Sequence, residues 1–254
     1  MTTLDPINDN SITRHLPLRG AIFDFNGTLS DDEPLLYEIY VSLFSETISY
    51  HLTRSDYFEN LAGLSDPEII SRVLRRCGLN EDRELERSLL SAKTSRYCDE
   101  VLDAPRIYLR NVAFVNAVAN AVPMALVTGA ARTEVHAALR AAGIFDSFVA
   151  IITAEDVKRG KPDPEGFLTA ARILTPLMER SASTSVEESI AVFEDSAFGV
   201  EAAERAGMLP VVVGDPAPPY ALGRLWIPSL SSSSYETISK LFTGTNPARP
   251  EVTQ

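Results

Sequence analysis

The sequence predicts an α/β fold in which a Rossmann-like parallel sheet carries an inserted bundle of helices. Several short apolar runs are bounded by turn residues, as expected of strands buried on both faces of a sheet. Helical patterns separate most of these runs, and this alternation is typical of a parallel sheet covered by helices. With 254 residues, 45% of them hydrophobic, the chain can bury a full core.

The expected strands are the apolar runs, which we take in chain order. Five of them should be buried in the sheet, and a sixth, residues 224–227, should add an edge strand. The five buried runs are residues 20–25, 123–128, 147–152, 189–194 and 209–213.

Four helices of the core are expected between and after these strands. The first covers residues 131–142 and ends at a glycine, which is a usual residue just past a helix end. The second, residues 163–174, opens with Asp-Pro-Glu, which offers an N-cap, a first-turn proline and a first-turn acid. The third covers residues 198–206. A Ser-x-x-Glu capping box that begins at Ser233 predicts the last helix over residues 235–242.

Residues 32–103 break the alternation of strands and helices. We find no convincing strand there, and apolar residues recur instead at helical spacing. The stripes with this spacing fall within residues 35–44, 69–74 and 85–90. The sequence therefore predicts a core made of residues 18–31 and 104–242, with a helical bundle at residues 32–103 inserted after the first strand.

Composition restricts the partners and the compartment. The net charge of −12 and the pI near 4.8 predict a surface that repels nucleic acid and anionic membranes, and the densest basic cluster, residues 158–161, is too small to reverse this. Cys77 and Cys98 match no metal-binding spacing and are expected to be reduced thiols. Residues 1–17 and 243–254 lack periodicity and are expected to be flexible. No signal peptide or membrane span is predicted, so we expect a cytoplasmic protein and favour a monomer.

Asp24 stands at the carboxyl end of the first predicted strand, where open α/β sheets bind ligands. Gly27 allows a sharp turn after it, so that backbone N–H groups from Asn26 to Thr28 could face an anion. Taken alone, a strand-end aspartate often only caps its turn. The case for a site therefore depends on the other strand ends.

Two further segments could hold phosphoryl oxygens. Thr128 and Gly129 end the second strand, and Arg132 follows one turn into the next helix, so that a hydroxyl group and a helix N-terminus meet there. An ordinary helix cap would explain Thr128 equally well. Lys161 stands in a loop stiffened by two prolines, just before a helix, where its ammonium could neutralise a phosphate.

Glu194 and Asp195 are adjacent acids at the end of the fourth strand. Together with Asp24 they would form an oxygen-rich site suited to Mg²⁺. Without a metal, three carboxylates in one crevice would repel each other. This cost argues against a purely structural role if the strand ends converge.

In this order the four segments resemble the motifs of the haloacid dehalogenase-like (HAD) hydrolases, and more closely those of the phosphoglycolate phosphatase and β-phosphoglucomutase branch. The resemblance runs from about residue 18 to residue 242, and the predicted bundle is similar to the family's type 1 helical cap, which closes over the site and selects substrate. The matching segments are Asp24-Phe25-Asn26-Gly27-Thr28, Thr128-Gly129, Lys161-Pro162 and Glu194-Asp195.

The resemblance implies a Mg²⁺-dependent phosphatase that acts on a small phosphorylated metabolite. Asp24 would attack phosphorus and become an aspartyl-phosphate, while Thr128 and Lys161 would hold the phosphoryl oxygens. The metal ligands would be Asp24, the backbone carbonyl of Asn26, Glu194 and Asp195. Further substrate contacts would come from Gly27, Thr28, Gly129 and Arg132.

Asn26 departs from the family pattern. The family usually has an aspartate there, which protonates the leaving oxygen and later activates water, whereas an amide cannot exchange a proton at neutral pH. Losing such acid–base help typically slows a reaction about 10²- to 10⁴-fold. Four explanations stay open: a good leaving group, a substitute acid such as Asp31, Asp32 or a cap residue, a deliberate or deamidation-prone substitution at Asn26-Gly27, and vestigial catalysis.

Two alternatives to a phosphatase follow from the same resemblance. A phosphomutase of the β-phosphoglucomutase type would carry an arginine in a cap loop similar to residues 63–66, but Asp66 stands here and would repel a second phosphate. A non-catalytic protein that binds a phosphorylated metabolite would result if Asn26 had ended turnover. Phosphonate-cleaving relatives need a cap lysine, for which Lys93 comes too late, and the acid pair argues against the metal-independent dehalogenases.

Overall fold

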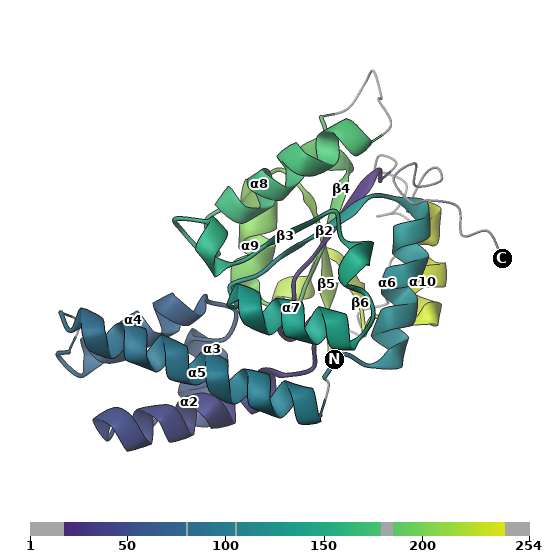
Figure 1. Ribbon diagram of the computed structural model, residues 1–254. Helices are drawn as coiled ribbons and strands as arrows, with labels where there is room; N and C mark the ends of the chain where they lie inside the picture. The colour runs from purple at the N-terminus through teal and green to yellow at the C-terminus, as the bar shows by residue number, and fades with distance from the viewer. Residues whose placement is uncertain (1–17, 80, 105, 179–184, 242–254) are drawn as a thin grey trace.

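A six-stranded parallel sheet forms the centre of the computed structural model, which describes residues 18–79, 81–104, 106–178 and 185–241 (Figure 1). All six predicted strands are present within their expected ranges, and their order across the sheet is β3-β2-β1-β4-β5-β6. The bounds are β1 Gly20–Phe23, β2 Met124–Val127, β3 Ala150–Ile152, β4 Ile190–Glu194, β5 Leu209–Val213 and β6 Leu225–Ile227. The predicted flexible ends lie outside the described residues.

The order of the strands brings the candidate residues to one edge. Strand β1 pairs with β2 on one side and with β4 on the other, and Phe23 is in register with Leu126 and with Phe193. Because all three strands are parallel, the residues that follow them leave the sheet at the same carboxyl edge. This is the switch point at which open α/β sheets bind ligands.

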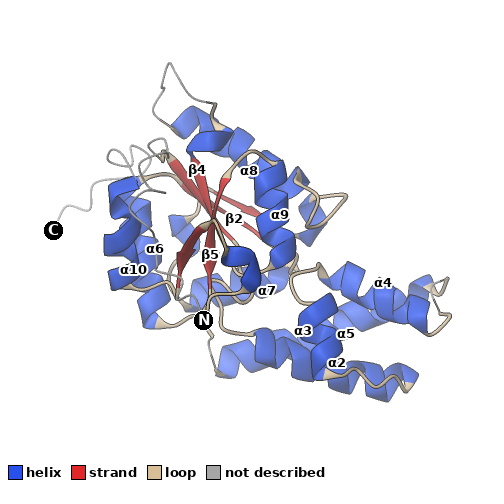
Figure 2. Cartoon of the chain, turned by 180° about the vertical axis from the view of Figure 1, so that it is seen from behind, coloured by secondary structure: helices blue, strands red, loops and turns tan. Residues whose placement is uncertain are grey.

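Helices cover both faces of the sheet, as the alternation predicts. Helices α8 (Glu165–Leu174) and α9 (Ala197–Arg205) lie on one face, and α6 (Leu109–Ala121), α7 (Arg132–Ala141) and α10 (Ser232–Ile238) lie on the other (Figure 2). Alternate residues of each strand pack towards opposite layers: Phe23 contacts the α6 side, whereas Ile22 packs with α8 and α9. The strands are therefore buried on both faces.

Two details differ from the sequence prediction. The last helix begins at Ser232 instead of residue 235, because Ser231, and not Ser233, is its N-cap: the Ser231 hydroxyl accepts a hydrogen bond from the Ser234 N–H. Helix α6 was not predicted at all. Its sequence, rich in alanine and asparagine, has a weak apolar stripe, yet Phe114, Val115 and Val118 are buried.

Four helices make up the segment between β1 and α6, which we call the helical insertion (residues 33–103). They are α2 Glu33–Ile48, α3 Arg54–Asn60, α4 Asp66–Arg76 and α5 Arg83–Asp103. Helix α5 packs against α2 and α4, and it also contacts α7 of the core. In Figure 1 the insertion lies to one side of the sheet, at the lower left. Its apolar stripes are buried as predicted, for example at Ile39, Ile70 and Leu89.

A buried ion cluster joins the insertion to the core. The ammonium of Lys93, on α5, contacts Asp66 of α4 at 2.8 Å and Glu134 of α7 at 2.7 Å. Burial alone would lower the pKa of Lys93, but the two carboxylates raise it above its ordinary value. Lys93 is therefore protonated and cannot act as the amine nucleophile of a phosphonate-cleaving enzyme.

Among the described residues, no helix combines the length and the apolar character that crossing a bilayer requires. Cys77 and Cys98 are both half-buried free thiols, in agreement with the prediction that they are reduced.

Candidate active site

Residues from three loops meet at the carboxyl edge of the sheet. Asp24 follows β1, Glu194 ends β4, and Lys161 precedes α8 in the loop that leads from β3. The Lys161 ammonium lies between the two acids and donates to Oδ1 of Asp24 and to Oε1 of Glu194. All three side chains are buried. The structure thus brings together residues that are up to 170 positions apart in the sequence.

Opposing electrostatic effects act on the buried carboxyl group of Asp24. Burial raises its pKa, repulsion from Glu194 raises it further, and the Lys161 ammonium opposes both, so that the pKa of Asp24 is about 7. Asp195 lies in the same group, and burial together with the charges of Asp24 and Glu194 raises its pKa well above the usual range. One ammonium does not balance three carboxylates.

The acids have a spacing that suits a cation. Asp24, Glu194 and Asp195 each offer an oxygen, and these oxygens lie within 4.8 Å of one another. Hard oxygen donors of this kind fit Mg²⁺. Both oxygens of Glu194 already accept hydrogen bonds, one from Lys161 and the other from the N–H and hydroxyl of Ser196 at 3.1 and 3.0 Å. Asp24 and Asp195 therefore have the oxygens that are more available to a metal.

Gly27 and Thr28, which are predicted to contact the substrate, both lie against Asp195. Gly27 has a φ of +79°, and a Cβ there would collide with the Asp195 carboxylate. Its N–H donates to the Ser30 carbonyl at 2.8 Å and so is not free for an anion. The Thr28 hydroxyl donates to Oδ1 of Asp195 at 2.9 Å.

Thr128 lies close to Asp24 in the structure. It lines the same small cavity as Asp24 and Lys161. Its hydroxyl accepts the N–H of Ala130 at 3.0 Å, whereas the N-cap of α7 is Ala131, so the alternative of an ordinary helix cap does not hold. The hydroxyl proton can therefore be donated to a phosphoryl oxygen. Gly129 is needed for packing, because a Cβ there would lie 2.7 Å from the Cα of Ser65 in the insertion.

Arg132 is placed away from this group. Its guanidinium pairs with Asp156 at 2.6 Å and is well exposed, and its backbone N–H donates to Glu155 at 3.1 Å. Asp156 ends the short 3₁₀ helix Ala154–Asp156 that follows β3, so the guanidinium of Arg132 is held there. That Arg132 binds substrate stays a prediction, and it would require the guanidinium to leave Asp156.

The side-chain amide of Asn26 forms a hydrogen bond with a neighbouring acid. Its amide donates to Oδ2 of Asp32 at 2.9 Å, and the Tyr97 hydroxyl donates to the same oxygen. Burial raises the pKa of Asp32. Asp31 points elsewhere: it is exposed and accepts the Tyr108 hydroxyl at 2.9 Å.

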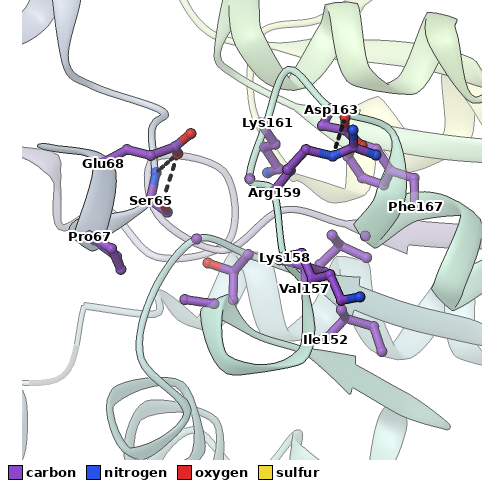
Figure 3. Close-up of a pocket in the computed structure, with 16 residues that line it drawn as sticks. Ser65, Pro67, Glu68, Ile152, Val157, Lys158, Arg159, Lys161, Asp163 and Phe167 are labelled. Atoms are coloured by element: carbon purple, nitrogen blue, oxygen red, sulfur yellow. Dashed lines mark hydrogen bonds and ion pairs between the residues drawn. The ribbon is translucent and has the colours of Figure 1, made fainter. Parts of the chain in front are cut away.

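Two cavities lie beside Lys161, and Thr128 and Gly129 line both as well. The smaller one, about 30 Å³, lies between Asp24 and the insertion. The larger one, about 280 Å³, lies beside the loop that carries Lys161, where Ser65 and Glu68 of the insertion face Lys161 and Arg159 (Figure 3).

The insertion contributes eight residues to the smaller cavity, and outside the loop 63–66 sequence reasoning did not find them. These are Glu33, Leu36, Tyr40, Tyr57, Gly63, Leu64, Asp66 and Ile69. Leu36, Tyr40 and Ile69 belong to apolar helical stripes, which predict core packing. Only the way the insertion folds back onto the sheet shows that they also face Asp24.

Comparison with known proteins decides the family. The sequence pattern described as haloacid dehalogenase-like hydrolase matches residues 18–207, which is well over half of the chain. The chain belongs to the HAD-like hydrolases. The predicted resemblance is thereby confirmed, and the family match extends from β1 through the insertion to the end of α9.

The curated relatives of this HAD-like hydrolase include several phosphatases. A chloroplastic 5-amino-6-(5-phospho-D-ribitylamino)uracil phosphatase of Arabidopsis thaliana is 31% identical over 80% of this chain, and the match spans 52% of that protein's length. A phosphorylated carbohydrates phosphatase of Thermotoga maritima is 28% identical over 75% of this chain and 82% of its own. A fructose-1-phosphate phosphatase of Escherichia coli is 29% identical over 74% and 93%.

Solved structures share the fold. β-Phosphoglucomutase from Clostridium difficile superposes with a TM-score of 0.73 over 88% of this chain and 96% of that chain, at 22% identity. CbbY from Rhodobacter sphaeroides, solved in complex with phosphate, gives a TM-score of 0.69 over 85% and 96%, also at 22% identity. At this level of identity the likeness establishes the Rossmann-like HAD architecture.

Proposed function

We propose that this HAD-like hydrolase is a Mg²⁺-dependent phosphatase of small phosphorylated metabolites, with Asp24 as its nucleophile. The observation that carries the proposal is the group formed by Asp24, Lys161 and Glu194, with Asp195 beside it, at the switch point of the sheet. The activities of the named relatives, which are phosphatases of small phosphorylated compounds, support the same class of substrate.

The chain's own residues account for the binding and the attack. Lys161 fixes the Asp24 carboxylate and places a positive charge where the phosphoryl oxygens gain negative charge. The Thr128 hydroxyl donates to one of those oxygens. Mg²⁺, held by Asp24, Asp195 and the Asn26 carbonyl with Glu194 alongside, would supply further positive charge at the phosphoryl group when bound.

The helical insertion acts as the cap in this proposal. Its loop before α4 lies directly on the core, since a Cβ on Gly63 would lie 2.5 Å from Cβ of Ser196 and Gly129 lies against Ser65. The cavity that it encloses beside Asp24 has room for little more than a single small group. The cap must therefore move to admit a metabolite, and its cavity residues would then select the substrate.

The function is tested by a screen of phosphate esters with and without Mg²⁺. The panel should contain sugar phosphates, phosphoglycolate, nucleotides and an aryl phosphate, whose leaving group needs little protonation. Release of phosphate from at least one member, dependent on the metal, is expected. Tight binding of phosphate esters without turnover of even the aryl phosphate would favour the non-catalytic binding protein instead.

Replacing Asn26 by aspartate is expected to raise the turnover of alkyl phosphates about tenfold. The new carboxyl would face Asp32, whose negative charge favours the protonated form, and a protonated acid can donate to the leaving oxygen. Steady-state kinetics of the Asn26→Asp variant would measure the gain. An unchanged or lower rate, with an unchanged fold, would show that a missing acid does not limit the reaction.

The stability of the metal-free protein is expected to fall as the pH rises from about 4 to about 7. The folded pKa of Asp24 is about 7 against an ordinary value of 3.8, so the folded state binds the extra proton and loses this advantage through that interval. Asp195 acts in the same direction. Thermal unfolding in a chelator over this pH range measures the effect. Mg²⁺ should raise the melting temperature most at the high end, where the acids are ionised.

A further inference from the structure

Glu33 is a carboxyl group inside the candidate active site that the proposed reaction does not yet use. It is the first residue of α2 and lines the small cavity together with Asp24, Asn26 and Lys161. The side chain is half-buried, so it is shielded from bulk water but open to the cavity. The Tyr57 hydroxyl, on α3, donates to its Oε2 at 3.0 Å and fixes its direction.

Several charges act on Glu33 from the elements around it. Burial raises its pKa most, and the neighbouring Asp32 and the Asp24 carboxylate raise it further, against the opposing effects of Tyr57 and Lys93, so that the pKa of Glu33 is about 8. The charge of Glu33 is in turn one of the causes that raise the pKa of Asp195. A carboxyl that keeps its proton at neutral pH has the property that an amide lacks.

We propose that Glu33 is the general acid and base that Asn26 cannot be, within the phosphatase reaction proposed above. Glu33 and Asp24 line one small cavity, which residues of the insertion enclose, so an ester attacked by Asp24 there would have its leaving group within reach of the Glu33 carboxyl. Glu33 follows Asn26 by seven residues, at the point where the loop after β1 enters the insertion.

The two steps of the reaction balance with Glu33 as the only proton carrier. In the first, Asp24 bonds to phosphorus, the bond from phosphorus to the leaving oxygen breaks, and that oxygen takes the Glu33 proton to become an alcohol. In the second, water attacks the phosphorus of the aspartyl-phosphate and gives a proton to the Glu33 carboxylate. The bond between phosphorus and Asp24 then breaks, and inorganic phosphate leaves.

The other nearby acids fit this role less well. Asp32 accepts hydrogen bonds from Asn26 and from Tyr97 at one oxygen, and it is not among the residues that line the cavity. Asp31 is exposed and accepts from Tyr108. Of the acids in the sequence 31–33, Glu33 alone lines the cavity with Asp24.

The test compares two kinds of substrate in the Glu33→Gln variant. Glutamine keeps the shape and the acceptor for Tyr57 but has no proton to give. The kcat for an alkyl phosphate should fall about 10²-fold. The burst of nitrophenolate from 4-nitrophenyl phosphate should change less than about threefold, because that leaving group departs without protonation. Glu38→Gln, at an exposed position of the same helix, is the matched control and should leave both rates unchanged.

The pH dependence of turnover and a double variant distinguish an acid–base role of Glu33 from a structural one. Alkyl-phosphate turnover by the wild type should fall above pH about 8, and this limb should be absent in Glu33→Gln. In the Asn26→Asp background, where an acid is restored, Glu33→Gln should reduce turnover less than about threefold. Equal losses in both backgrounds would overturn the proposal.

Failure of this inference can be told apart from failure of the proposed function. If the wild type turns over phosphate esters while Glu33→Gln keeps the full alkyl-phosphate rate and the same pH limb, Glu33 is not the acid and the phosphatase function stands. If no ester is turned over by the wild type or by Asn26→Asp, the proposed function itself fails.

Discussion

Replacing Asp24 by asparagine is expected to lower phosphatase turnover by about 10⁴-fold or more, equivalent to at least roughly 5 kcal/mol of barrier. Asparagine keeps the size of the side chain but cannot form the acyl-phosphate bond. It also removes one of the three carboxylates that crowd the site. The metal-free Asp24→Asn protein should therefore melt at a higher temperature than the wild type at neutral pH, although it is inactive.

Asp31→Asn is the matched control for this change. Asp31 is exposed, and its carboxylate accepts a hydrogen bond from the Tyr108 hydroxyl. Its loss should alter turnover less than about twofold. If Asp24→Asn kept more than a few per cent of the wild-type rate, Asp24 would not be the nucleophile, and attack on phosphorus would have to come from water or another group.

Replacing Lys161 by methionine is expected to have the second largest effect, a loss of about 10³-fold in kcat/KM. Lys161 holds both Asp24 and Glu194, so its positive charge lies directly beside the expected nucleophile. Methionine would leave two buried carboxylates unpaired. Removing one partner of a buried ion pair typically costs about 3–5 kcal/mol of unfolding free energy.

Because of that cost, the activity of Lys161→Met is best measured with saturating Mg²⁺, which would offset part of the repulsion, and alongside a denaturant titration. Lys158→Met serves as the control, since Lys158 lies in the same loop but is exposed. A folded Lys161→Met protein with near wild-type kcat/KM would contradict the assignment of Lys161 to the reaction.

Much of the fold could be predicted from the sequence. Short apolar runs such as residues 209–213 are strongly specific for buried strands, and their alternation with capped helices leaves few other architectures. Helix α6 was not predicted because its alanines and asparagines give no clear helical periodicity of apolar residues. Its formation depends on packing against the sheet. The start of α10 was missed because four consecutive serines, residues 231–234, offer several equivalent caps.

The part of the candidate site that could be predicted consists of the reactive side chains that follow the ends of the strands. Asp24, Lys161, Glu194 and Asp195 fall together because parallel strands end on one edge of the sheet. The roles of Gly27 and Thr28 were not predictable, because the sequence does not show that Asp195 packs into the turn after β1.

The acid at Glu33 was hidden for a different reason. It follows two other acids at the start of a helix, where the helix dipole commonly stabilises negative residues. A glutamate at this position therefore does not by itself indicate a catalytic role. Only the enclosure of the cavity by the insertion, together with the hydrogen bond from Tyr57, sets it apart from Asp31 and Asp32.

Trapping the covalent intermediate tests the central claim most directly. The protein is mixed with an aryl phosphate and Mg²⁺, quenched in acid within the burst, digested, and analysed by mass spectrometry. The account predicts that one phosphoryl group is carried by the peptide that contains Asp24, and that this adduct is absent from Asp24→Asn. Rapid turnover with no phosphorylated peptide in the burst, or with the phosphoryl group on another residue, would contradict it.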